Sequence, residues 1–245
     1  MNSYEWNILD TGVHTAEENM RLDRELLETL DPYALPILHF YEWERDSATY
    51  GHFTDPSQFL DLHEAKRRGL ELAKRPTGGG IVFHIWDFAF SVLIPAEHPQ
   101  FSPNTLDNYG FVNNAVLSAV SAFLSGRPPL EIIKEDLPAA DPSCQRFCMA
   151  QPTKYDVVLH GKKIAGAAQR KTKKGFLHQG TIALKVPPRE YLEAVLLPHS
   201  KVLEAIEART FPLIQSEEDI EKARQELKSL LQKHMTQEYS YVTKE

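Results

Sequence analysis

Apolar residues follow a helical period in some parts of the chain and a strand-like pattern in others. A stripe of leucines and a methionine runs through residues 20–30, behind a possible capping pair, Thr15 and Glu18, so a helix is predicted there. Runs rich in aliphatic and aromatic residues predict strands at 6–9, 37–43 and 48–53. Pro56 suits the first turn of a second helix, predicted over 56–68 and ended by Gly69.

The middle of the chain carries a glycine triplet followed by two apolar runs. Residues 81–84 and 88–94 are separated by a short turn, so we predict the two arms of a hairpin. Consecutive glycines cost conformational entropy, so residues 78–80 indicate positive φ or a backbone close to a ligand, with a β-bulge or loop as the alternative. No Lys-Ser/Thr pair and no helix follows them, which excludes a P-loop and a dinucleotide fingerprint.

Three strands in succession are predicted further along, at 155–159, 162–170 and 176–184. A helix is predicted before them, at about 105–124, and three after them, starting near residues 188, 200 and 216. Strands and helices are interspersed without strict alternation. The order favours an α+β fold with a mixed or antiparallel central sheet flanked by helices.

Composition narrows the functional classes. The 245 residues carry a formal net charge of −7, which argues against a nucleic-acid partner. No apolar run is long enough for a membrane helix, and the N-terminal residues lack the features of a signal peptide, so we expect a cytoplasmic protein that does not enter the membrane. The two cysteines are expected to be free thiols, and no Cys/His spacing indicates a metal site.

One pairing suggests chemistry. Cys148 lies just before the first of the three consecutive strands and Lys163 lies in the second, and neighbouring antiparallel strands bring such residues together. A cationic amine beside a thiol favours the thiolate, which attacks carbonyl carbon. By themselves, a loop cysteine is more often inert and a strand lysine more often solvated. The pairing is therefore a hypothesis.

Three segments in order, RPTGGGIVFH, GKKIAGAAQRK and GFLHQGTIAL, resemble the biotin/lipoate protein ligase and octanoyltransferase superfamily, over about residues 19–184. The resemblance implies one catalytic domain of this fold spanning residues 1–245. Residues of about 187–245 then form a helical extension, too short for the full accessory domain of many lipoate–protein ligases. A biotin ligase is disfavoured because the Gly-Arg-Gly loop of that branch is missing.

The position of the cysteine distinguishes the branches of the superfamily. The commonest bacterial octanoyltransferases carry a nucleophilic cysteine after the lysine motif, where this chain has none. A second type, typical of Gram-positive bacteria, has its cysteine before the three strands, followed by Pro and a Tyr-acidic pair. Cys148, Pro152, Tyr155 and Asp156 are similar to that pattern, and Lys163 corresponds to its lysine. The resemblance thus implies that Cys148 and Lys163 are catalytic.

The implied activity is transfer of an octanoyl or lipoyl group from an acyl carrier protein thioester, through Cys148, to a lysine. The acceptor is a lipoyl domain of a 2-oxoacid dehydrogenase E2 subunit or the glycine-cleavage H protein, and no cofactor is needed. A related amidotransferase moves octanoyl between carrier proteins. The alternatives are a lipoate–protein ligase, which uses ATP and Mg to make an acyl-adenylate, and a non-catalytic lipoyl- or acyl-binding module.

Further residues receive roles from the motifs. The substrate-binding residues are expected to be Arg75, Thr77, Gly78, Gly79, Gly80, His84, Gly166, Ala167, Gln169 and Gly180. His84 is a candidate proton shuttle, and Ile81, Phe83 and Ile164 are expected to line an acyl tunnel. A basic cluster on an acidic protein, Arg170, Lys171, Lys173 and Lys174, is a candidate docking patch or merely a solvated turn.

Overall fold

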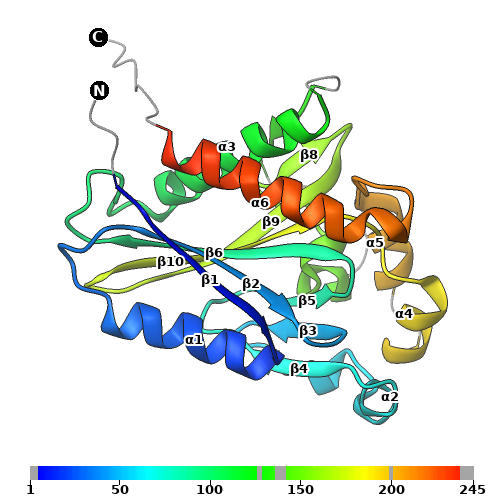
Figure 1. The fold of residues 1–245 in the computed structure, drawn as a ribbon. Coiled ribbons are helices and arrows are strands. Elements are labelled where there is room, and N and C mark those ends of the chain that lie inside the picture. The colour runs from blue at the N-terminus through cyan, green and yellow to red at the C-terminus, as the bar shows by residue number, and fades with distance from the viewer. Residues whose placement is uncertain (1–4, 126–128, 136–141, 199–200, 238–245) are drawn as a thin grey trace.

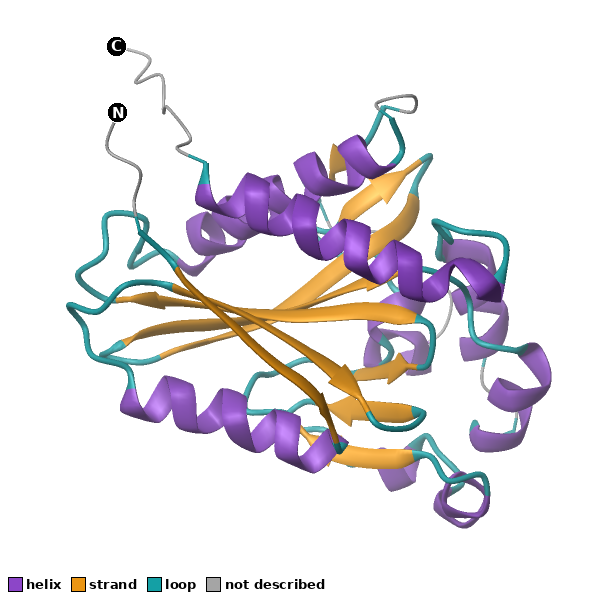
Figure 2. Ribbon diagram, viewed as in Figure 1, coloured by secondary structure: helices purple, strands orange, loops and turns teal. Residues whose placement is uncertain are grey.

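The structure is a computed structural model that describes residues 5–125, 129–135, 142–198 and 201–237. Two β-sheets form its centre, with helices on both sides (Figures 1 and 2). The mixed α+β fold expected from the sequence is confirmed. Within the described ranges, no helix combines the length and the apolarity that crossing a bilayer requires.

The larger sheet has seven strands in the order β1-β2-β6-β10-β9-β8-β7. β1 and β2 are parallel and the other neighbours are antiparallel, so the sheet is mixed. The strands are β1 Asn7–His14, β2 Ile37–Trp43, β6 Asp87–Pro95, β7 Glu131–Ile132, β8 Val157–Leu159, β9 Lys162–Lys171 and β10 Gly175–Ala183. The three consecutive strands predicted from the sequence are β8, β9 and β10, and they pair in succession as expected.

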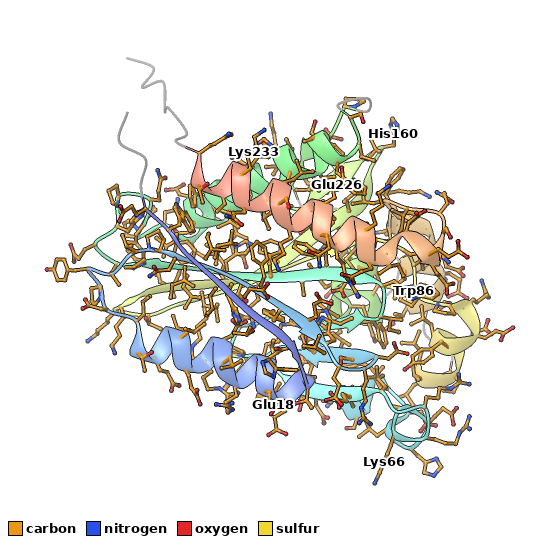
Figure 3. All side chains as sticks on the ribbon, in the orientation of Figure 1. Glu18, Lys66, Trp86, His160, Glu226 and Lys233 are labelled. Atoms are coloured by element: carbon orange, nitrogen blue, oxygen red, sulfur yellow. The ribbon has the colours of Figure 1, made fainter. Side chains whose placement is uncertain are left out.

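The smaller sheet has the order β4-β3-β5. Its strands are β3 Ser47–Tyr50, β4 Glu71–Lys74 and β5 Ile81–His84. The predicted hairpin of residues 81–84 and 88–94 is wrong in its pairing, because β5 pairs with β3 while β6 enters the larger sheet. The strand positions were correct, but apolar patterning does not specify the partner of a strand. The chain crosses between the sheets at Trp86, which Figure 3 labels.

Two long helices, α3 Thr105–Phe123 and α6 Ile220–Thr236, lie together over one face of the large sheet (Figure 1). Helix α1, Ala16–Thr29, lies on the opposite face and also contacts β4. It begins with the predicted capping box of Thr15 and Glu18. The three short helices are α2 Leu62–Arg67, α4 Arg189–Val195 and α5 Val202–Arg209.

Strand β6 shows why the sheet is covered on both faces. All of its residues are buried. Its alternate residues Phe88, Phe90, Val92 and Ile94 join the core under α3 and α6. Leu93, of the intervening set, packs with Leu27 of α1 on the other face. Because successive side chains of a strand point to opposite faces, a continuous apolar run is what this central position requires.

The helix predicted over 56–68 is interrupted. Pro56–Gln58 forms one turn of 3₁₀ helix, and α2 begins only at Leu62, behind the N-cap Asp61. Between them Leu60 is buried and makes an isolated β-bridge with Leu196. This tertiary contact outweighs the local helical preference. Residues 199–200 and 238–245 of the predicted C-terminal extension lie outside the described residues.

Candidate active site

A cavity of about 160 Å³ lies between the large sheet, the small sheet and the loop that carries Cys148. Its walls come from α1, β2, β3, β5, β9 and β10, so distant parts of the sequence meet there. Most of the site residues predicted from the sequence line it: Cys148, Lys163, Arg75, Gly79, Gly80, His84, Gly166, Ala167 and Gly180. The exceptions are Thr77, Gly78, Gln169 and the four cations of the β9–β10 hairpin.

Cys148 is half-buried at the start of a 3₁₀ turn, Cys148–Ala150. The preceding residue, Phe147, is buried and forms a parallel β-bridge with Ile81 of β5. A side chain at Gly80 would collide with the carbonyl of Arg146, so glycine allows the cysteine loop to lie directly against the end of the glycine triplet. The triplet therefore supports the cysteine through backbone packing, a role that its motif alone did not reveal.

The amine of Lys163 is the centre of the site. Its Nζ lies 3.3 Å from Cys148 Sγ, 2.8 Å from the Cys148 carbonyl oxygen and 2.7 Å from Asp156 Oδ2. An ammonium has three N–H donors, and these three partners engage all of them. The predicted approach of Cys148 and Lys163 is confirmed in its geometry. Lys163 is directed at the sulfur, which leaves no donor for an acyl oxygen in this state.

Asp156 determines the charge of that lysine. Burial by itself disfavours the charged amine, but the charges of Asp156 and Cys148 outweigh it and raise the pKa of Lys163. Burial also raises the pKa of Asp156. The charge of Lys163 and the hydrogen bonds from Thr153 act in the opposite direction and reduce this increase. The backbone N–H and the hydroxyl of Thr153 donate to Asp156 Oδ2 over 2.7 and 3.0 Å. Lys163 is thus a protonated amine at neutral pH, held beside the thiol.

Replacing Gly166 by alanine is expected to disrupt this group. A Cβ at residue 166 would overlap the Cε and Nζ atoms of Lys163. Because the lysine is fully buried, it can move only by breaking its contacts with Cys148 and Asp156. We expect the acyl transfer that the sequence resemblance implies to fall by roughly 100-fold. Steady-state kinetics provides the test, with Gly110→Ala in α3 as the control, since a Cβ there would meet no atom within 4 Å apart from its chain neighbours and the backbone of its own helix. Equal activity in the two variants contradicts the assignment.

Arg75 is buried and holds the glycine triplet in place. Its Nη2 donates to the carbonyls of Gly78 and Gly80, at 2.9 and 2.8 Å. Its Nη1 donates to the carbonyl and hydroxyl of Thr49. Gly79, between the two carbonyls, has φ of +89°, which a side chain would strain. The guanidinium therefore shapes the loop, and its terminal nitrogens are directed at protein oxygens.

His84 was expected to be available as a proton shuttle, but it is enclosed by protein groups. Its Nδ1 lies 2.6 Å from Asp87 Oδ2, and its Nε2 lies 2.9 Å from the hydroxyl of Thr49. Its ring also stacks on Trp43, with 4.2 Å between centroids. With both nitrogens engaged, His84 stabilises the cavity wall in this structure, and it has no nitrogen left over for substrate.

Thr77 and Gln169 do not line the cavity but form hydrogen bonds with residues of β10. The hydroxyl of Thr77 donates to the side-chain oxygen of Gln179, whose amide nitrogen donates to the buried Asp23 over 2.6 Å. Asp23 also pairs with His39 at 2.9 Å. This chain of hydrogen bonds connects the glycine triplet to α1 and β2. Gln169 donates to Nδ1 of His178, inside the large sheet.

The residues expected to line an apolar tunnel, Ile81, Phe83 and Ile164, do not line the main cavity. Strand β5 presents Val82 and His84 to the main cavity. Ile81 and Phe83 pack in a separate core with Phe147, beside a smaller cavity of about 30 Å³. Ile164 belongs to the core under α3 and α6. Alternate residues of a strand face opposite sides, and the sequence does not show which side faces the cavity.

His178 is expected to make the protein less stable in acid. Burial lowers its pKa to about 3, while an unfolded histidine titrates near 6.5. Between these two pKa values the unfolded state binds a proton that the folded state does not. The free energy of unfolding is therefore highest above about pH 6.5 and falls by about 1 kcal/mol per pH unit toward pH 3. His178→Gln should flatten the dependence of Tm on pH between 7 and 4, whereas His63→Gln, at an exposed position, should not. Parallel slopes in parent and His178→Gln contradict the assignment.

Two residues of the site received no role from the sequence. Asp156 was noted only as part of the Tyr-acidic pair, although an acid directly before the buried strand Val157–Leu159 is a signal for a paired charge. Gln179 lies in the middle of β10, all of whose residues are buried, and it joins Thr77 to Asp23. A polar amide within a fully buried strand is a comparable signal, because such a group needs partners.

Comparison with known proteins shows which family the chain belongs to. The model of the lipoyl protein ligase A/B catalytic domain matches residues 15–236. The chain belongs to this family. The expected superfamily is thereby confirmed, and the glycine triplet, Cys148, Asp156 and Lys163 lie within the matched range.

Relatives within the family include octanoyltransferases named LipM. The chain is 28% identical to LipM of Carboxydothermus hydrogenoformans, over 74% of this chain and 65% of the relative, and 28% identical to LipM of Geobacillus kaustophilus, over 82% and 73%. It is 27% identical to LipM of Bacillus subtilis, over 84% and 75%. The chain thus spans about two thirds to three quarters of the length of these relatives.

Solved structures of lipoate–protein ligases share the fold. A bipartite lipoate protein ligase from Thermoplasma acidophilum, described with its E2 lipoyl domain, superposes with a TM-score of 0.65 at 21% identity, covering 96% of this chain and 94% of the other. Lipoate-protein ligase A bound with ATP gives 0.62 at 23% identity, covering 98% and 96%. At these identities the likeness concerns the fold.

Proposed function

We propose that this protein is an acyltransferase of lipoate metabolism. It moves an octanoyl or lipoyl group from an acyl carrier protein thioester, through Cys148, to a lysine of an E2 lipoyl domain or of the glycine-cleavage H protein. The observation that carries the proposal is the 3.3 Å contact between Cys148 Sγ and the buried Lys163 ammonium, at a cavity between the two sheets. The relatives named octanoyltransferase LipM support it.

In the first half-reaction the sulfur of Cys148 attacks the thioester carbonyl. The new C–S bond forms as the bond to the carrier sulfur breaks, and the carrier leaves as a thiolate that takes a proton from solvent. The Lys163 ammonium stabilises the cysteine thiolate before attack, because it lies next to the sulfur and Asp156 holds it there. The octanoyl group then occupies Cys148 as a thioester.

In the second half-reaction a neutral lysine ε-amine of the acceptor attacks the acyl carbon. An amide bond forms, the bond to Cys148 breaks, and the amine proton passes to solvent while the cysteine returns as a thiolate beside Lys163. The small side chains of Ala167 and Ala168, which line the cavity, leave space for the acyl chain. The thioester is already activated, so this route needs no cofactor.

The alternative is a lipoate–protein ligase that uses ATP and Mg, because solved ligases share this fold. An acyl-adenylate route needs cations that can reach a phosphate. Arg75 and Lys163 border the cavity, and both direct their terminal nitrogens at oxygen or sulfur atoms of the protein. This arrangement supports the transferase route.

The β9–β10 hairpin remains our candidate for attracting acidic carrier or lipoyl domains. Its cations are Arg170, Lys171, Lys173 and Lys174. The amines of Lys171 and Lys174 donate to the carbonyls of Pro103 and Glu28, which orders the turn without neutralising its charge. At about 3.3 Å per strand residue, Lys171 lies roughly 26 Å along β9 from Lys163, so the hairpin suits long-range steering. We also propose that residues 1–245 belong to one catalytic domain of a cytoplasmic enzyme.

Acyl transfer with and without nucleotide separates the candidates. The protein is mixed with octanoyl-acyl carrier protein and either H protein or an E2 lipoyl domain, and acceptor mass is followed. We expect one octanoyl group per acceptor without ATP, and the faster acceptor identifies the natural partner. Transfer that requires ATP, Mg and free octanoate assigns the chain to the ligases. No transfer under either condition points to a non-catalytic binding module.

A further inference from the structure

The opening of the cavity can be located from the exposure of its lining residues. Most of them are buried or half-buried, but Gly79, Gln145 and Thr153 are exposed. These three residues come from the glycine triplet, the loop before Cys148 and the loop after it. A protein that delivers a lysine to Cys148 must therefore approach over these three segments.

A large aromatic side chain lies beside this opening. Phe53 is 91% exposed, the highest value among the large hydrophobic residues that the structure describes. Its loop is fixed to the glycine triplet region, because the N–H of His52 donates to the carbonyl of Thr77 over 3.0 Å. The hydroxyl of Thr54 donates to the carbonyl of Gly79, also over 3.0 Å. Phe53 therefore projects from a well-anchored loop at the rim of the cavity.

Cations are distributed around the same rim. Arg146 and Lys154 are exposed and directly follow the opening residues Gln145 and Thr153. Lys154 also contacts the ring of Tyr155, at 5.2 Å. The acidic Asp55 lies two residues after Phe53, where its carboxylate accepts hydrogen bonds from Ser57 as a helix cap. On a chain of net charge −7, a cationic rim around an exposed aromatic residue fits an acidic protein surface that carries an apolar contact.

We propose that Phe53, Arg146 and Lys154 form the docking surface for the acceptor domain. Phe53 is the apolar anchor, and the two cations pair with carboxylates of an acidic lipoyl domain whose lysine enters between Gly79 and Thr153. This inference rests on the proposed function, since it takes the acceptor to be a lipoyl domain. It assigns short-range contact to the rim and long-range attraction to the β9–β10 hairpin.

Binding of an isotope-labelled apo lipoyl domain to the full chain tests this surface without any chemistry. NMR titrations give Kd for the parent, Phe53→Ser and Arg146→Glu. We expect Kd to rise about tenfold or more for each variant, because an aromatic anchor and a cation at a protein interface carry much of the affinity. Val13→Ser is the matched control. Val13 is 58% exposed in the edge strand β1, where it pairs with Glu42 of β2. It neither lines the cavity nor belongs to the β9–β10 hairpin, so the Kd of this variant should stay within twofold of the parent.

A Kd for Phe53→Ser within twofold of the parent overturns the inference, as does a parent chain that does not bind the lipoyl domain at millimolar concentration. An equal loss in Phe53→Ser and Val13→Ser also overturns it, because the effect is then not specific to the rim. The proposed function is tested separately by acylation of Cys148 from octanoyl-acyl carrier protein. Acylation with no effect of Phe53→Ser on binding removes the docking surface and leaves the acyltransferase in place.

Discussion

Replacing Cys148 with alanine is expected to abolish acyl transfer, with a fall of at least about 10³-fold in the rate of octanoyl delivery to an acceptor domain. In the proposed mechanism the sulfur forms the bond that carries the acyl group between the two half-reactions, and it lies 3.3 Å from the amine of Lys163. Loss of a nucleophile removes the covalent route entirely. Because Cys148 is only half-buried, the change should affect Tm little.

Cys144 provides the matched control for this variant. It is the only other cysteine of the chain, and it is buried in the core that includes Phe147 and α5. Cys144→Ala should lower the free energy of unfolding by about 1 kcal/mol while transfer continues. If Cys144→Ala loses transfer and Cys148→Ala keeps it, the assignment of the nucleophile is reversed. If both keep it, the covalent mechanism is excluded.

Replacing Lys163 with methionine is expected to lower the rate of Cys148 acylation by roughly 100-fold or more. The ammonium next to the sulfur is lost, so alkylation of Cys148 by iodoacetamide should slow as well. The variant also leaves the buried Asp156 carboxylate without its cation. Removing one partner of a buried ion pair destabilises a protein by about 3–5 kcal/mol, so Tm should fall markedly.

A double variant separates folding from chemistry in this second prediction. Lys163→Met with Asp156→Asn removes both charges, and the introduced amide can still accept a hydrogen bond from Thr153. We expect the double variant to regain much of the lost Tm while acylation stays slow. If the double variant acylates Cys148 within threefold of the parent rate, Lys163 is only a structural partner of Asp156.

The arrangement of the site was predictable from the sequence where strands that follow one another along the chain also lie side by side in the sheet. Strands β8, β9 and β10 follow one another through short turns, so the approach of Cys148 and Lys163 followed from local patterning. The capping box before α1 and the limits of β2 were predictable for the same reason, since their signals are local.

Long-range pairing was not predictable in this way. The runs that became β5 and β6 have short-range signals of a hairpin, yet each has its partner in a different sheet. The need for glycine at residue 80 depends on Arg146, which is 66 positions away in the chain. The burial of Asp156 depends on Lys163 and on the sheet around it. Such contacts arise from tertiary packing, which the pattern of one segment does not contain.

The most direct test of the central claim is the intact mass of the protein after incubation with octanoyl-acyl carrier protein in the absence of ATP. We predict the gain of one octanoyl group that hydroxylamine removes, present in the parent and in Cys144→Ala and absent in Cys148→Ala. A parent protein that gains no octanoyl group without ATP, while it modifies an acceptor with ATP and free octanoate, contradicts the covalent mechanism.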